Sequence, residues 1–110
     1  MMYRIAEFIE GGRSPFADWF DELDGPTAAR VDRYIRRLEA GNFGSAKPLR
    51  EGVFEVVMDF GPGYRLYYGV EGKTIIILLG GGSKRSQQRD IGAAVERWQR
   101  YKDQMNRGGI

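Results

Sequence analysis

Apolar and polar residues alternate along three stretches of the chain, and this period of two predicts three strands. The stretches cover residues 3–8, 53–60 and 64–70, and side chains two positions apart lie on the same face of a strand. An unbroken apolar run at 74–79 predicts a fourth strand that is covered on both faces. We therefore expect the 74–79 strand in the centre of a sheet.

The short connection at 61–63, Gly-Pro-Gly, predicts a hairpin between the second and third strands. Pairing that is symmetric about its proline places Asp59 opposite Arg65 and Val57 opposite Tyr67. Arg65 and Tyr67 then lie on an open face of the sheet.

Apolar residues recur at helical spacing in three other stretches, 16–23, 28–38 and 87–105. Ser14 precedes the first stretch and is the expected N-cap, and Ser86 has the same position before the last one. A Gly-Pro break separates the first two stretches, so we expect them to form an antiparallel helical hairpin. The last stretch predicts a long C-terminal helix.

The predicted order is strand, two helices, three strands and helix, or β-α-α-β-β-β-α. This order indicates one α+β domain over residues 1–110, with a small and mostly antiparallel sheet, an N-terminal helical hairpin and a C-terminal helix. The stretch at 42–52, which is rich in glycine and proline, is expected to be a loop.

Composition changes this picture mainly by what is missing. The 110 residues include no cysteine and no histidine, so disulfides, the usual zinc ligands and the usual neutral-pH general base are absent. We therefore expect no metal and no cofactor. Catalysis would depend on Arg, Lys, Tyr or a carboxylate, or on positioning and electrostatics. No apolar run has the length of a membrane span, and the N-terminus lacks the apolar core of a signal peptide, which predicts a cytoplasmic protein.

Charge is unevenly distributed, although the net charge is only +2. Residues 1–29 hold two basic and six acidic side chains, whereas residues 84–110 hold seven basic and three acidic ones. This asymmetry is typical of a protein whose C-terminal half meets an anionic partner.

Two cationic segments flank the apolar 74–79 strand. Arg65 precedes it, and a glycine triplet at 80–82 leads into Lys84 and Arg85 after it. Backbone N–H groups in such a turn bind anions, but the spacing of a Walker loop is absent. Taken singly, the triplet could be an ordinary turn, and Arg65 could pair with Asp59. Their convergence, together with Arg50, predicts a site for polyphosphate or a nucleic-acid backbone.

The second predicted helix carries Arg30, Arg33 and Arg37 on a common face. This stripe could bind nucleic acid or could be a solvated surface. Acidic residues are interspersed, and Asp32 can pair with Arg36 at i+4, which favours the solvated surface.

The runs at 53–68 and 75–91 together resemble the RelE/ParE toxin superfamily, in the branch of HigB-like addiction-module killer proteins. The specific pieces are Gly-Pro-Gly-Tyr-Arg at 61–65 and Gly-Gly-x-Lys-x-x-Gln-x-x-Asp-Ile at 81–91. The resemblance implies the toxin of a type II toxin–antitoxin system that cuts mRNA on the ribosome, with no metal, by attack of the ribose 2′-OH. Its implied partners are a helix-turn-helix DNA-binding antitoxin, the ribosome and mRNA.

The resemblance also assigns roles to individual residues. Arg65 would stabilise charge on the phosphate, and Lys84 and Arg85 would hold the backbone or protonate the leaving oxygen. Beyond the positions that the resemblance assigns, four further residues are predicted to bind RNA or phosphate: Arg50, Lys47, Tyr67 and Arg89.

The chain departs from the pattern of the RNA-cutting relatives at three positions. Val57 stands where many relatives have a cation, Glu55 on the same strand is acidic, and Ile91 falls near a position that is tyrosine in some nucleases. Two alternatives therefore remain open. One is a ParE-like inhibitor of DNA gyrase, and the other is a catalytically degenerate protein that binds an antitoxin.

Overall fold

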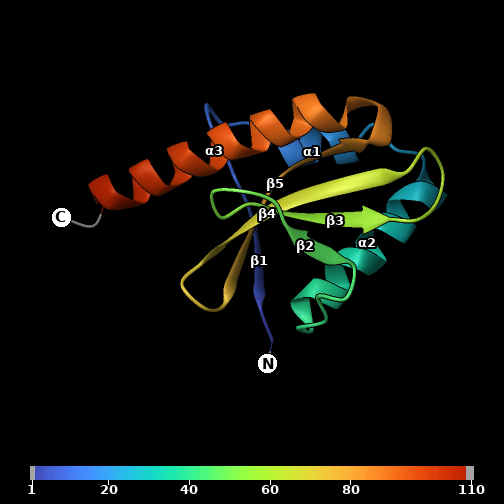
Figure 1. The fold of residues 1–110 in the computed structure, drawn as a ribbon, viewed down its shortest axis with the longest axis horizontal. Helices are drawn as coiled ribbons and strands as arrows, with labels where there is room; N and C mark the ends of the chain where they lie inside the picture. Colours follow the sequence, from blue (N-terminus) through green and yellow to red (C-terminus); the bar gives the residue numbers. More distant parts are fainter. Residues whose placement is uncertain (1, 109–110) are drawn as a thin grey trace.

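The computed structural model describes residues 2–108 and is drawn in Figure 1. Its elements follow one another in the order β1 (Arg4–Glu7), α1 (Pro15–Phe20), α2 (Gly25–Glu39), β2 (Ala46–Pro48), β3 (Phe54–Met58), β4 (Tyr64–Glu71), β5 (Ile75–Ser83), the short 3-10 turn η1 (Lys84–Ser86) and α3 (Gln87–Gly108).

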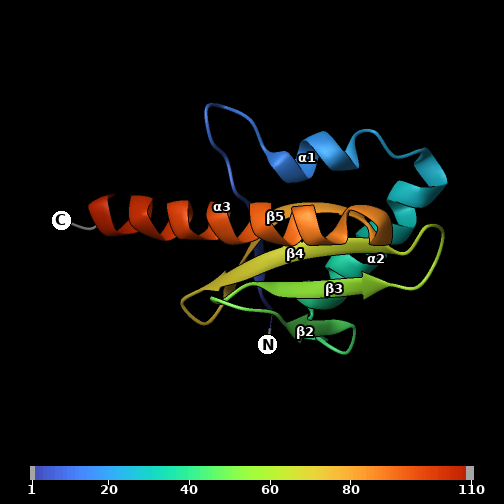
Figure 2. The same ribbon diagram turned by 45° about the horizontal axis from the view of Figure 1, so that its top comes forward.

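The five strands form one sheet in the order β1-β5-β4-β3-β2, and the predicted α+β class is confirmed. β1 runs parallel to β5, and every other neighbouring pair is antiparallel. α1 and α2 follow β1 in the chain and connect it to the other strands. β1 lies at one edge of the sheet, and β2 lies at the other. β5 has a neighbour on each side, which agrees with its apolar sequence. Figure 2 shows β5, β4, β3 and β2 following one another across the sheet.

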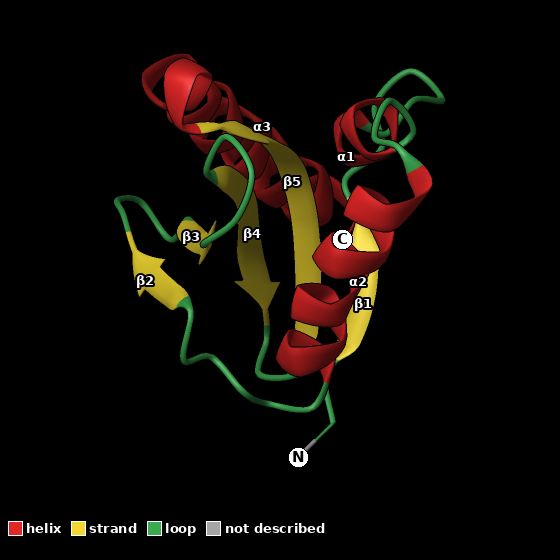
Figure 3. Ribbon diagram, turned by 90° about the vertical axis from the view of Figure 1, so that its right-hand side faces the viewer, coloured by secondary structure: helices red, strands yellow, loops and turns green. Residues whose placement is uncertain are grey.

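The helices cover the two faces of the sheet with separate apolar clusters. α1 and α2 lie over one face, and α3 lies over the other (Figure 3). The first cluster joins Val31 and Ile35 of α2 to the strand residues Val56 and Leu66. The second contains Phe8, Val53, Tyr67, Ile77, Leu79, Ile91, Ala94 and Trp98. The predicted alternation along the strands therefore divides the side chains between two cores.

The predicted loop at 42–52 contains a strand, which corrects the expected element order. Ala46–Pro48 forms β2 and pairs with β3 in the register Ala46↔Val56 and Lys47↔Glu55. The backbone N–H of Val57 also donates to Ser45 O at 3.0 Å. Pairing with β2 satisfies polar groups that β3 would otherwise present at an open edge. Three residues are too few for a period of two to be visible in the sequence.

The hairpin between β3 and β4 forms, but its register differs from the predicted one. Val57 pairs with Arg65 and Glu55 with Tyr67, so Asp59 is not opposite Arg65. The connection is centred on Gly61, which has a φ of 56°, and not on the proline. The partner of Arg65 is Val57 and not Asp59, a shift of two residues. A shift by an even number keeps each side chain on its predicted face of the sheet.

The glycine triplet at 80–82 lies inside β5 and does not form the expected phosphate loop. A Cβ on Gly81 would overlap the ring of Trp19, and one on Gly82 would overlap the carboxylate of Asp90. The two glycines thus let one helix approach each face of the strand. β5 ends at Ser83. Ser83, and not the predicted Ser86, is the N-cap of the helical segment that follows, and Ser86 lies within η1.

We expect Gly81→Ala to lower the free energy of unfolding by about 1–3 kcal/mol, because the Trp19 ring must move away from the added methyl group. Gly92→Ala is the matched control, since no heavy atom lies within 4 Å of its Cβ position. There alanine should stabilise the helix by about 0.5–1 kcal/mol. Urea unfolding followed by circular dichroism measures both. Equal effects would show that the Trp19 contact is unimportant.

The helix starts follow ordinary capping chemistry. Ser14 Oγ accepts from the N–H of Ala17 at 3.0 Å, so the predicted cap of α1 is confirmed. Asp24, which the sequence analysis did not single out, caps α2 by accepting from the N–H of Thr27 at 2.8 Å. This bond lowers the pKa of the Asp24 carboxyl. Among residues 2–108, no helix combines the length and the apolar character that crossing a membrane requires.

Candidate functional site

Arg65 lies near the start of β4, on the face that α3 covers. Its Nη1 donates to the carbonyl oxygens of Gly63 at 3.0 Å and Tyr64 at 3.4 Å. Only 11% of the side chain is exposed. The guanidinium is therefore held in one place by its own turn before any ligand arrives.

The β5–α3 junction brings Lys84 beside Arg65. A Cβ built on Gly63 would lie 3.3 Å from Arg65 Nη1 and 3.3 Å from Lys84 Cβ, so both side chains meet at this glycine. Lys84 and its neighbour Arg85 are exposed. The structure thus places Arg65 with the Lys84, Arg85 segment, although they are about twenty positions apart in the sequence.

Glu55 lies at the centre of this region and is 0% exposed. Its Oε2 accepts from Gln87 Nε2 at 2.8 Å and lies 4.0 Å from Arg65 Nε, and its Oε1 lies 3.5 Å from Lys47 Nζ. A buried carboxylate is tolerated when cations and hydrogen bonds compensate its lost hydration. The acidic residue beside Arg65 is therefore Glu55. Asp59, which the sequence suggested as the partner of Arg65, is exposed.

The Tyr67 side chain is 0% exposed beneath α3, so it does not lie on an open face. Burial, and then the negative charge of Glu55, raise the pKa of its hydroxyl far above the usual value. The hydroxyl therefore stays protonated at neutral pH. The expected contact of Tyr67 with RNA is not available in this arrangement. Ile91 is also buried, with 7% exposed, and packs in the α3 core.

The remaining predicted cations are not all at the site. Lys47 reaches it through Glu55, but its side chain is 58% exposed. Arg89 is 84% exposed on the first turn of α3, where its Nε lies 3.9 Å from Asp90 Oδ1. Lys47 is thus linked to Arg65 through Glu55, whereas Arg89 contacts its own neighbour on the helix.

Arg50 lies at the opposite end of the sheet from Arg65. It belongs to the turn in which the N–H of Val53 donates to Arg50 O, and Gly52 of this turn abuts Trp98. Trp98 also covers Gly69, which is four residues or about 13 Å along β4 from Arg65. The prediction that Arg50 joins the cationic ring is therefore wrong. A turn that is read from sequence does not show which end of a sheet it will occupy.

Sequence reasoning missed two residues that organise the site, Gln87 and Asp90. Gln87 donates to Glu55, and Asp90 accepts from Ser86 Oγ directly above Gly82. Their signal was present in the Lys-x-x-Gln-x-x-Asp spacing, which puts both side chains on the first turn of a helix. The hydrogen bonds of Gln87 and Asp90 stabilise the β5–α3 junction, which carries Lys84.

The arrangement combines one fixed guanidinium with exposed cations on a single rim. Arg65 is rigid, whereas Lys84, Arg85 and Arg89 are exposed and able to adapt to a ligand. A fixed donor stabilises charge at one defined point, and mobile cations hold a polyanion around it. The geometry suits binding of a phosphodiester whose phosphate lies at Arg65.

The chain was compared with protein-family models, with curated proteins and with solved structures. No protein-family model matches the chain. Toxin RelE from E. coli, as a double mutant in the free state, has a TM-score of 0.68 and 13% identity, over 88% of this chain and 98% of that chain. The toxin–antitoxin complex RelBE2 from Mycobacterium tuberculosis gives a TM-score of 0.59 and 20% identity, over 76% of this chain and 100% of that chain.

The chain has the fold of toxin RelE, which is the fold that the sequence resemblance implied. An uncharacterized protein of Haemophilus influenzae is 40% identical over 77 residues, which is 69% of this chain and 78% of that protein. The chain belongs to the same family as the Haemophilus influenzae protein.

Proposed function

We propose that the protein is the toxin of a type II toxin–antitoxin system and acts as a ribosome-dependent mRNA endonuclease. The observation that carries this proposal is the meeting of the fixed Arg65 guanidinium with Lys84 at Gly63. The RelE-like fold supports the toxin class. Membership of the HigB-like branch stays a prediction.

In the proposed reaction, the 2′-hydroxyl of a ribose loses its proton to water and its oxygen attacks the adjacent phosphorus while the bond to the 5′-oxygen breaks. The products are a 2′,3′-cyclic phosphate and a new 5′-hydroxyl end. Arg65 would stabilise the negative charge that accumulates on the phosphate oxygens, because its donors are already oriented. Lys84 or Arg85 would hold the backbone and donate a proton to the departing oxygen.

We assign Glu55 a positioning role in this scheme. With 0% exposed, its carboxylate does not reach the surface where RNA would lie. Its Oε2 lies 4.0 Å from Arg65 Nε, too far for a hydrogen bond, and attracts the guanidinium by charge while two carbonyls accept hydrogen bonds from Nη1. Arg65 is thus held at the turn where Lys84 also approaches Gly63.

An antitoxin is the expected partner. The neighbouring M. tuberculosis structure is a complex of a toxin with an antitoxin, and an exposed cationic rim is readily masked by a complementary acidic segment. We expect the antitoxin of this protein to cover or distort the region of Arg65 and Lys84. A structure of the complex that leaves this region open would instead indicate indirect neutralisation.

Transcriptome-wide mapping of new RNA 5′ ends, minutes after induction, tests the proposal. We expect cuts in phase with codons that disappear in the Arg65→Ala variant. Growth arrest without new RNA ends would contradict cleavage and favour the gyrase alternative, which gyrase pull-down and DNA-damage assays would test. Expression without any growth defect would instead favour a degenerate antitoxin-binding protein.

A further inference from the structure

A second cluster of cations and aromatic rings lies outside this site, on α2 and the β3–β4 connection. The Arg30 guanidinium carbon lies 3.9 Å from the ring centre of Phe60, and that of Arg37 lies 4.7 Å from the ring centre of Tyr34. The Tyr34 and Phe60 rings stack with centres 6.3 Å apart and planes at 23°. We call these four residues the arginine–aromatic strip.

The arginines of the strip are free of acidic partners. None of the ion pairs among residues 2–108 includes Arg30 or Arg37, and both side chains are exposed. Arg36 on the same helix differs, because it pairs with Asp32 at 3.5 Å and Glu39 at 3.0 Å. The solvated, paired helix surface predicted from the sequence therefore describes Arg36, whereas the strip keeps uncompensated positive charge beside aromatic faces.

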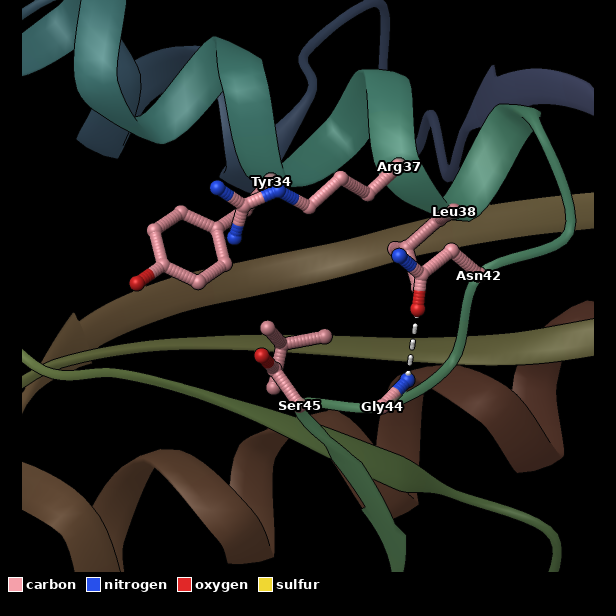
Figure 4. A pocket seen from close by; sticks show the side chains of 7 residues that line it. Tyr34, Arg37, Leu38, Asn42, Gly44 and Ser45 are labelled. Carbon is pink, nitrogen blue, oxygen red and sulfur yellow. Dashed lines mark hydrogen bonds between the residues drawn. The ribbon is translucent and has the colours of Figure 1, made fainter.

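A polar pocket of about 250 Å³ lies at one end of the strip, between α2 and the loop that follows it (Figure 4). Tyr34 and Arg37 extend into it from α2, Asn42 and Ser45 face them, and Leu38 and Val56 complete its lining. Asn42 Oδ1 accepts from the N–H of Gly44 at 3.0 Å, which leaves the Asn42 amino group available to a ligand. The pocket is smaller than the ~300–1,000 Å³ typical of small-molecule sites, which favours one planar group of a larger ligand.

The other end of the strip leads to the candidate site. Phe60 lies 5.3 Å from the Tyr64 ring, and Tyr64 directly precedes Arg65 on β4, so the strip and Arg65 lie on opposite faces of the sheet beside the same connection. Figures 1 and 2 show the start of α2, the β3–β4 connection and the start of α3 at the same end of the molecule. A flexible chain bound at Arg65 can therefore pass over this connection onto the strip.

We propose that the arginine–aromatic strip binds single-stranded RNA that extends from the Arg65 site, with phosphates on the arginines and bases packed against the exposed parts of the Tyr34 and Phe60 rings that the guanidiniums leave uncovered. Aromatic faces interleaved with cations are the usual means of holding single strands without sequence preference. An acidic peptide would use the charge but would gain little from stacked ring faces, so the rings favour RNA. This inference rests on the proposed function for its class of ligand, but its test does not require cleavage.

Binding of a labelled, unstructured 2′-O-methyl RNA of about 12 nucleotides, without ribosomes, tests the strip. This probe lacks the attacking hydroxyl, so it stays intact. We expect Tyr34→Leu to weaken binding roughly 5- to 100-fold, because it removes the ring against which Arg37 and a base would pack. Arg37→Gln should reduce the slope of log K against log salt by about 0.7, because one phosphate contact is lost.

Arg36→Gln is the matched control, because it removes the same charge from the same helix without touching the strip. Thermal unfolding verifies that the Tyr34→Leu variant is folded, and Arg37→Gln alters only an exposed side chain. Strip variants that bind RNA no more weakly than Arg36→Gln would overturn the inference. Selective loss of binding to a glutamate-rich peptide, with RNA binding intact, would overturn it in favour of an antitoxin contact. Failure of mRNA cleavage in cells, with strip-dependent binding retained, would overturn only the proposed activity.

Discussion

Arg65→Ala is expected to abolish growth inhibition and to reduce RNA cleavage by about 10²–10³. The reason is that Arg65 is the one cation of the predicted site whose guanidinium the structure fixes, through two carbonyl oxygens and Glu55. Loss of a donor that is already oriented removes stabilisation at the point where charge develops. Quantitative primer extension on a ribosome-bound message measures the rate, and colony counts after induction measure toxicity.

Two variants serve as controls for this experiment. Arg36→Ala removes an exposed cation on α2 that has no role in the proposed reaction, so its effect should stay within about 10-fold. Arg65→Lys keeps the charge but loses the fork of donors, and an intermediate rate is expected. Full activity of a folded Arg65→Ala protein would remove Arg65 from the catalytic machinery.

Glu55→Ala is expected to lower the free energy of unfolding by about 3 kcal/mol. Removing one member of a buried ion pair usually costs about 3–5 kcal/mol, since the remaining charge stays out of water. Here that charge is Arg65, with 11% of its side chain exposed. The lower end of the range applies because Lys47 is 58% exposed and rehydrates. Urea unfolding with a two-state fit gives the value.

Asp18→Ala is the matched control for Glu55→Ala. Asp18 also pairs with an arginine, at 3.1 Å from Arg13, but the two side chains are 50% and 75% exposed. Removal of such a surface pair should change stability by less than about 1 kcal/mol. A Glu55 variant that resembles the Asp18 variant would mean that Arg65 finds other partners or water when Glu55 is absent.

Local patterns predicted most of the elements, because their causes are local. The helix that begins after Ser14 and the division of β3 and β4 side chains between two faces follow from spacing within a few residues. β2 and the end of β5 were missed for a different reason. β2 exists only because β3 offers a partner, and the glycines of β5 belong to a strand only because Trp19 and Asp90 approach them.

The same distinction applies to the candidate site. Arg65 and the Lys84, Arg85 segment were found from their residue types and from motif resemblance. Glu55 looked like a departure from the family pattern, yet its burial with Arg65, Lys47 and Gln87 makes it the centre of the site. Exposure and pairing depend on α3, which packs over this face from a distant part of the chain.

By itself, the sequence determined the α+β class, the helix and strand periods, the superfamily resemblance and the chemical character of the site, which contains cations and no histidine. These follow from residue type and short-range spacing. Only the tertiary structure decided the hairpin register and the burial of Glu55 and Tyr67. It also decided that Arg50 lies at the other end of the sheet from Arg65, and that Arg30 lies over Phe60. Each of these depends on contacts between segments far apart in the chain, and such contacts leave no periodic trace in a single sequence.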